Sequence, residues 1–150
     1  MKNYRNAFTM IEIVFVIVVL GILAAVAIPK LAVTRTDAQL VKAKSTVSAV
    51  RSAITGERQT RLFRGQSNFI SRLDRGVATG AADVVIFDSN GSNNLLQYGI
   101  TTKTGNGGWL KASATTYTYT VNGVVNTFTY NSAAGTFLCT NGANCRTLTN

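Results

Sequence analysis

The chain has 150 residues, which is room for one domain of ordinary size and a segment outside it. Lys and Arg number 15 against 6 Asp and Glu, so a net charge of +9 favours anionic partners or simply keeps the surface soluble. There is no histidine, and two cysteines alone cannot complete a four-ligand zinc site. We therefore expect no catalytic residues, no cofactor and no metal site, and we do not expect an enzyme.

The two cysteines, Cys139 and Cys145, are best explained as a disulfide. Disulfides persist in oxidising compartments, so this interpretation places the C-terminal part outside the cytoplasm. The bond would close a short ring around a loop that has little hydrophobic core of its own. A free pair of thiols is the alternative.

The N-terminus begins with a basic leader, residues 1–7, followed by an apolar segment, residues 8–29, which we call the stem. As a helix the part of the stem from Phe8 to Ile28 is about 31 Å long, close to a bilayer core of roughly 30 Å. A core helix of a soluble domain is the alternative, but the stem is apolar on all sides. Lys2 and Arg5 should stay cytoplasmic, which sends the rest of the chain across the membrane.

Glu12 is the one acid inside the stem. A carboxylate at bilayer depth costs about 2.5–3.5 kcal/mol when central and less near an end, so it usually has a partner. The α-amino group of a chain cleaved before Phe8, its own or a neighbour's, is a candidate. A bond to the neighbour would fix the axial register of packed helices. The alternative is that the Glu12 side chain extends to the membrane–water interface and has no protein partner.

The sequence Phe8-Thr9-Met10-Ile11-Glu12 after a basic leader ending in a small residue resembles the prepilin signature of type IV pilins and type II secretion pseudopilins. The resemblance covers roughly residues 2–30. It implies that prepilin peptidase cleaves between Ala7 and Phe8 and N-methylates Phe8. Ala7 stands where the family usually has glycine.

The resemblance also assigns roles within the stem. Glu12 matches the acid that the family uses for filament assembly. Gly21 and Pro29 stand where pilins commonly have residues bounding a helix stretch that loosens in the filament. A loosening there is physically reasonable, because Gly weakens a helix by about 1 kcal/mol and interior Pro by about 3. In pilins a C-terminal loop closed by a disulfide is frequent, which fits Cys139 and Cys145.

Residues 30–62 predict the amphipathic half of the same helix. Its apolar residues step by three and four, as on one helix face, and Val33 extends the stripe one heptad back. We expect the stripe to pack on a sheet, with a partner helix as the alternative. The stripe is formed by Leu40, Ala43, Val47, Val50 and Ile54.

Six arginines lie between residues 51 and 75, and Arg58, Arg61 and Arg64 recur every three positions. They suggest an anion-binding patch, for example for DNA drawn in during transformation. A solvated face or contacts between subunits are the alternatives. Residues 66–73 predict a short second helix capped by Ser67.

Residues 63–150, which we call the head, predict a linker and an antiparallel sheet. Residues 83–87, 95–100 and 136–139 are expected strands. Asp88 and the alternating polar residues after it resemble the start of a calcium loop, but Gly99 stands where the bidentate Glu would be.

The clearest local prediction in the head is a hairpin, with strands 115–121 and 124–130 joined by Asn122-Gly123 in a type I′ turn. That turn pairs Val121 with Val124, Tyr119 with Asn126 and Tyr117 with Phe128. The face expected to cover the amphipathic helix then carries Tyr117, Tyr119, Val121, Val124, Phe128 and Tyr130.

These features predict an α+β, type IV pilin-like fold: a long N-terminal helix, half membrane-spanning and half amphipathic, packed on a small antiparallel β-sheet head. The function implied is a structural subunit of a type IV pilus or type II secretion-like filament. Its expected partners are other pilin or pseudopilin subunits, prepilin peptidase and an assembly platform in the bacterial inner membrane. After assembly the head would be extracellular, in a pilus, or periplasmic, in a pseudopilus. A pseudopilin of a DNA-uptake system and a non-polymerising, membrane-anchored binding protein are the alternatives.

Overall fold

The computed structural model describes residues 8–88 and 95–149, with the side chain of residue 32 left aside. The leader, including Ala7, and residues 89–94 of the considered calcium loop lie outside this range. The described elements confirm the α+β class. They are α1 (Met10–Phe63), β1 (Val85–Ile86), β2 (Ile100–Thr101), β3 (Trp109–Lys111), β4 (Thr116–Val121), β5 (Val124–Asn131), β6 (Thr136–Asn141) and α2 (Cys145–Thr149).

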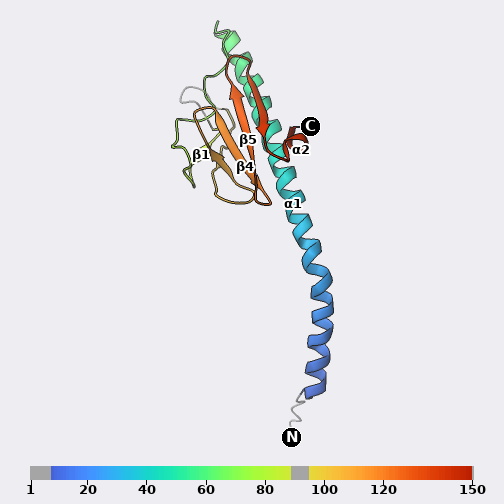
Figure 1. Ribbon diagram of the computed structural model, residues 1–150. Coiled ribbons are helices and arrows are strands. Elements are labelled where there is room, and N and C mark those ends of the chain that lie inside the picture. The colour runs from blue at the N-terminus through green and yellow to red at the C-terminus, as the bar shows by residue number, and fades with distance from the viewer. Residues whose placement is uncertain (1–7, 89–94, 150) are drawn as a thin grey trace. The chain divides into compact units, whose positions relative to one another are not determined.

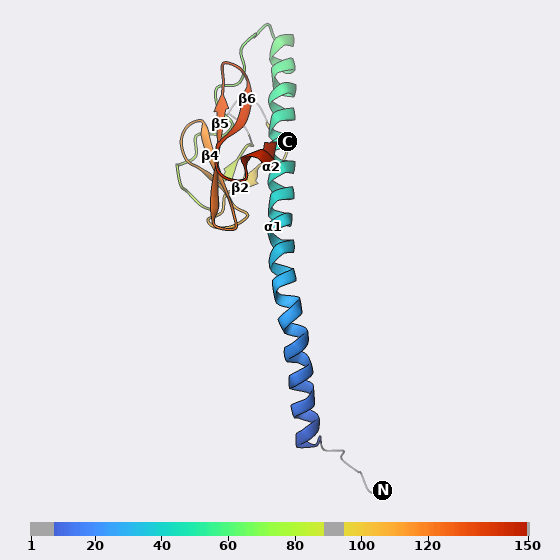
Figure 2. The ribbon, with the colours of Figure 1, turned by 45° about the vertical axis from the view of Figure 1, so that its right-hand side comes forward.

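The chain divides into two compact units at Arg35 and Thr36, so α1 contributes to both and each unit is described on its own. In the second unit the apolar stripe of α1 packs against the sheet, as predicted (Figures 1 and 2). Leu40 is partly buried at its start, and Val33, predicted to extend the stripe, belongs to the first unit. The buried members are Ala43, Val47, Val50 and Ile54.

Gly65 ends α1 with a left-handed residue, at a φ of 77°. The N–H of Gln66 donates to the carbonyl of Arg61 at 2.9 Å, and the N–H of Gly65 donates to the carbonyl of Leu62 at 3.0 Å. This is the Schellman pattern, which satisfies carbonyls at a helix end. The apolar residues that follow are held by the sheet, since the hydroxyl of Tyr130 donates to the carbonyl of Ile70 at 2.7 Å. The predicted helix 66–73 is therefore wrong, and this segment is a loop.

The main sheet has the antiparallel order β3-β4-β5-β6. The predicted hairpin register is confirmed: Val121 pairs with Val124, Tyr119 with Asn126 and Tyr117 with Phe128. Asn122 and Gly123 both have positive φ, at 46° and 78°, as a type I′ turn requires. The local chemistry of two residues thus sets the register of β4 and β5.

The inward face of the hairpin is mostly as predicted. Tyr117, Tyr119 and Val121 on β4, with Phe128 and Tyr130 on β5, are at most 2% exposed. Val124, at the hairpin end, is 38% exposed, so its predicted place in the buried face is wrong. The buried position on β5 nearest the turn belongs instead to the polar Asn126.

Aromatic rings fill the space between the sheet and the loop that carries β1. Phe87 and Trp109 meet edge to face with centroids 5.5 Å apart, and Phe128 stacks on Phe137 at 5.4 Å. Tyr117 completes the cluster against Phe87, at 4.7 Å. Such rings bury large apolar areas, so a small head gains a core from few residues.

Strand predictions outside the hairpin were only partly right. The strand expected at 83–87 is reduced to β1, because Asp83 and Phe87 have φ of 56° and 58° and leave the extended conformation. The strand expected at 95–100 is reduced to β2, which pairs with β1. The strand expected at 136–139 is β6 and runs two residues further. Two elements were not predicted, β3 and α2.

Candidate functional site: the stem and the contacts of the head

The stem is helical from Met10 onward, and its large apolar side chains are exposed on every side. Across the described residues, α1 is the one helix long and apolar enough to cross a membrane, with a window of mean hydropathy 3.1 and no burial within the structure. A core helix would be covered by its own domain. Within its own unit, none of the described residues covers the stem, so its apolar surface is left for lipid or for other helices.

Thr9 caps the first turn of the stem, a role that the sequence analysis missed. Its side-chain oxygen accepts a hydrogen bond from the N–H of Glu12 at 3.3 Å, and its carbonyl accepts from the same N–H at 3.1 Å. Threonine at the N-cap with Glu at the third helical position is the capping-box pattern. A Glu in the first turn also faces the positive end of the helix dipole. Glu12 therefore lies at the N-terminal end of the stem, with its side chain exposed.

Gly21 and Pro29 both lie within continuous α1. A side-chain carbon added at Gly21 would meet no atom within 4 Å, so packing inside the chain does not require glycine there. Pro29 cannot donate a backbone hydrogen bond to the carbonyl four residues earlier. The helix is thus weakened at two points without being broken at either.

Arg58 and Arg61, two of the three arginines predicted to bind anions, have structural contacts. The Arg58 guanidinium carbon lies 4.0 Å from the centre of the Phe69 ring, a cation–π contact. Arg61 Nη2 donates to Asn68 Oδ1 at 3.2 Å, and both arginines are half-buried. Arg64 is exposed at the end of α1. The three side chains therefore do not form one open patch of equivalent cations.

The disulfide between Cys139 and Cys145 is present, with Cα atoms 5.3 Å apart. It joins β6 to α2, whose Leu148 is 1% exposed in the core. Buried Asn126 holds the intervening loop: its Oδ1 accepts from the N–H of Asn144 at 3.0 Å, and its Nδ2 donates to the carbonyl of Tyr119 at 3.3 Å. The signal in the sequence that could have identified Asn126 is a polar residue at an inward position of a strand whose other inward residues are apolar.

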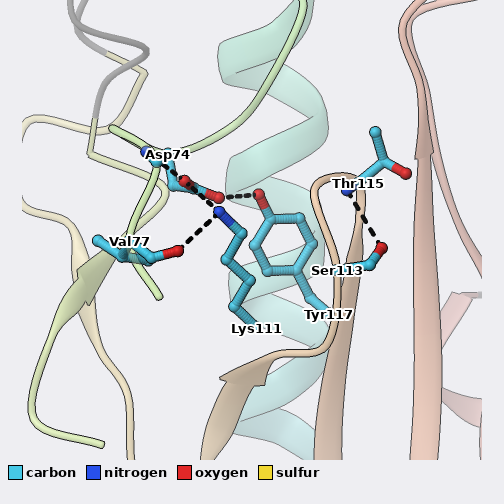
Figure 3. A network of polar contacts seen from close by, with 7 residues as sticks. Asp74, Val77, Lys111, Ser113, Thr115 and Tyr117 are labelled. Atoms are coloured by element: carbon cyan, nitrogen blue, oxygen red, sulfur yellow. Dashed lines mark hydrogen bonds and ion pairs between the residues drawn. The ribbon is translucent and has the colours of Figure 1, made fainter. Parts of the chain in front are cut away.

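Asp74 forms a buried polar network that ties the loop after α1 to the sheet (Figure 3). Lys111 Nζ donates to Asp74 Oδ1 at 2.8 Å and to the carbonyl of Val77 at 3.0 Å, while the Tyr117 hydroxyl donates to Asp74 Oδ2 at 2.6 Å. The N–H of Gly76 adds a bond of 2.6 Å to Oδ1. Each oxygen of the carboxylate has a partner, which is what a buried charge requires.

The network shifts the pKa of Asp74 and the pKa of Tyr117. Burial opposes the charge on Asp74, but the bonds from Lys111, Tyr117 and Gly76 outweigh it and lower the pKa of Asp74 below 3.8. Burial, then the hydrogen bond to Asp74, raises the pKa of Tyr117 far above 10.0. Burial also raises the pKa of Tyr130 to about 12. At neutral pH Asp74 is a carboxylate and both tyrosines are protonated, so the network is structural.

No group of three or more His, Cys, Asp or Glu residues that could hold a metal ion occurs among the residues that the structure describes. The buried acid of the head is already bonded to a lysine and a tyrosine. The functional features are therefore an exposed apolar helix with one acid near its start and a small stapled head.

Comparison with known proteins agrees that the N-terminal apolar helix is a functional segment. Residues 2–28 match the prokaryotic N-terminal methylation motif, which is the type IV pilin and pseudopilin signature. This motif supports a protein of the type IV pilin or pseudopilin class, a structural class, and implies processing by prepilin peptidase and assembly with other pilin subunits. With the apolar helix it points to anchoring in a membrane. No curated protein and no solved structure matches the chain.

Proposed function

We propose that this protein is a filament subunit, stored in the bacterial inner membrane and drawn into a helical fibre through its stem. The observation that carries the proposal is that the methylation motif at residues 2–28 coincides with a helix whose apolar surface is wholly exposed. A helix of this kind is soluble only in lipid or among copies of itself. Stems packed side by side would form the fibre core, and heads would form its outer layer. The repeated contact would be heterologous and non-closing, which produces a fibre and not a ring.

Residues 1–7, 8–29, 30–62 and 63–150 would act in turn as removed leader, fibre core, amphipathic support and head. Cleavage between Ala7 and Phe8 would free an α-amino group close to the first turn of α1, where Glu12 lies. A bond between Glu12 of one copy and the methylated Phe8 amine of the next would pair two charges that are costly to leave alone in lipid. Gly21 and Pro29 would let the stem loosen as subunits pack, since each weakens the helix locally.

The test is to replace Glu12 by Ala and follow assembly in the natural host by shearing surface fibres and by crosslinking neighbouring copies. Asp37→Ala is the matched control, because Asp37 is an exposed acid further along the same helix. We expect E12A to be cleaved and inserted but to give few or no multimers, and D37A to assemble normally. Wild-type multimers from E12A would refute the register role. Mass analysis of the mature N-terminus should show methylated Phe8, and a retained Met1 would refute the processing step.

A DNA-uptake role is the second candidate, favoured by the excess of arginine in residues 51–75 and by exposed Arg64 at the end of α1. DNA held by such contacts dissociates steeply with added salt, by roughly one counterion per neutralised phosphate. The substitution to test is Arg64→Gln on the full chain in detergent, because it removes one exposed positive charge from this region. A smaller salt slope for this variant would support DNA contact. A steep slope left unchanged by Arg64→Gln would count against it.

A further inference from the structure

A groove in the second unit, between α1 and α2, has a lining that is both cationic and rich in hydroxyls. Its volume is about 310 Å³, near the lower limit for small-molecule sites. Figure 2 shows α2 lying beside the part of α1 that forms one wall. The lining residues are Lys44, Val47, Ser48, Arg51, Ser52, Leu148 and Thr149.

Arg51 is fixed at the back of this groove. Its Nε donates to the carbonyl of Phe137 at 2.9 Å, and Nη1 donates to the carbonyl of Thr149 at 3.4 Å. A guanidinium has five N–H donors in a rigid plane, so two bonds to carbonyls orient it and leave donors for a ligand. The site therefore has a positioned cation and not only a mobile surface charge.

Two serines of the groove keep their hydroxyls available. Elsewhere on α1, Thr34, Thr46, Thr55 and Thr60 each donate to the carbonyl four residues earlier, at 3.0–3.2 Å. Ser48 and Ser52 have no such bond within the described chain, although they occupy the same helix and are exposed. Spaced by four, they lie one above the other on the wall of the groove.

Among the described residues that line the groove, the charged ones are all cationic. Lys44 and Arg51 both line it, and no acidic side chain does. Val47 and Leu148 form an apolar floor, and both are 1% exposed. The groove thus offers the positioned Arg51, the cationic Lys44 and two serine hydroxyls. These donors match an oxyanion that carries more than one charge and several acceptor oxygens.

We propose that this groove binds a phosphate group, as inorganic phosphate or as a phosphate monoester. Arg51 and Lys44 pair with the charged oxygens, and the hydroxyls of Ser48 and Ser52 donate to the remaining ones. A carboxylate offers one charge and two oxygens, so it uses fewer of these donors and binds more weakly. None of its residues belongs to the stem, so the proposal does not rest on filament assembly.

The test uses the full chain in a maltoside detergent, which carries no phosphate, with inorganic phosphate as the probe and NMR amide shifts as the readout. Shifts should map to residues 44–52 and 148–149, with millimolar affinity and with acetate at least about tenfold weaker. Lys44→Gln and the double substitution S48A/S52A should each weaken phosphate binding about tenfold, the equivalent of about 1.4 kcal/mol. Arg51 is left intact because it also supports the fold.

Lys42→Gln and Ser45→Ala are the matched controls, since both residues are exposed on α1 and do not line the groove. They should leave phosphate binding unchanged. Equal weakening by Lys42→Gln and Lys44→Gln would overturn the proposal, since only net charge would then matter. Equal affinity for acetate and phosphate would overturn it as well. So would an absence of phosphate binding while Lys44→Gln reduces crosslinking between copies, a result that would make the groove a subunit contact.

Two sources of the phosphate group can be separated. Glycerol 3-phosphate in solution tests a soluble ligand, and phosphatidic acid mixed into the same micelles tests a lipid headgroup. Shifts at Ser48 and Ser52 in either titration support the site, and the tighter of the two identifies the source.

Discussion

Arg51 Nε donates a hydrogen bond of 2.9 Å to the backbone carbonyl of Phe137, joining the middle of α1 to β6, which is an outer strand of the sheet. An outer strand carries unpaired backbone groups along its free side, and these invite pairing with other chains. Arg51 covers one such carbonyl, and its second bond to Thr149 draws α2 to the same place. One side chain of the helix thus covers part of the edge of the sheet.

Replacing Arg51 by Ala should destabilise the head by about 1.5–3 kcal/mol, the usual contribution of a hydrogen bond that involves a charged group. It should also increase aggregation, because the carbonyl of Phe137 loses its cover. Arg146→Ala is the control, since Arg146 is exposed on α2. Thermal unfolding and light scattering measure the two effects. Equal stability of both variants would show that the bond contributes nothing.

Replacing Lys111 by Met should cost about 3–5 kcal/mol, because it leaves the carboxylate of Asp74 buried without its counterion. The side chain of Asp74 is fully buried and that of Lys111 is 7% exposed, so water cannot take the place of the lost charge. Adding Asp74→Leu to this variant should recover much of the loss, since the unpaired charge is then gone. Chemical denaturation measures both, with the exposed Lys103→Met as the control. A double variant no more stable than Lys111→Met would contradict the explanation.

Gly135→Ala should destabilise the head more than Gly123→Ala. Both glycines have positive φ, 67° and 78°, so both substitutions carry the same backbone strain. A side-chain carbon at Gly135 would in addition collide with the ring of Phe69, whereas at Gly123 it would meet nothing within 4 Å. Overpacking costs about 1–3 kcal/mol, so we expect a difference of that size in the free energy of unfolding. Equal losses would mean that Phe69 moves aside freely.

Stability should fall as the pH rises from 10 to 12, in part because of Tyr130. Burial raises the pKa of Tyr130 to about 12, so in this range the unfolded chain loses the proton while the folded chain keeps it. Unfolding then releases a proton, and each pH unit lowers stability by about 1.4 kcal/mol per such tyrosine. Tyr130→Phe should reduce the slope of stability against pH by one proton, whatever its effect at neutral pH. An unchanged slope would show that Tyr130 already ionises in the folded state.

The parts of the fold that the sequence predicted are those governed by local chemistry. Asn122-Gly123 defines the hairpin and its register, and the spacing of Ala43 and Val47 defines the buried face of α1. The stem needs no tertiary information, because an exposed apolar run is evident from composition. In these places neighbouring residues alone decide the structure.

The features that the sequence did not predict depend on contacts between residues far apart in the chain. Lys111 and Asp74 are 37 positions apart, and Arg51 and Phe137 are 86 apart, so one sequence gives no reason to pair them. The strand expected at 83–87 was longer than β1 because an apolar run does not reveal that Asp83 and Phe87 adopt the left-handed conformation and interrupt it. The three regularly spaced arginines were grouped by spacing, whereas Arg58 contacts Phe69 and Arg61 contacts Asn68, which spacing alone does not reveal.

Trp109 is the only tryptophan in the chain, and it is 1% exposed among the rings of Phe87, Tyr119 and Phe128. The stem contains no tryptophan at all. Intrinsic fluorescence therefore reports on the head alone, as a signal already present in the natural chain. Folding of the head can be followed without labels while the same molecule is in a micelle, in a membrane or in a fibre.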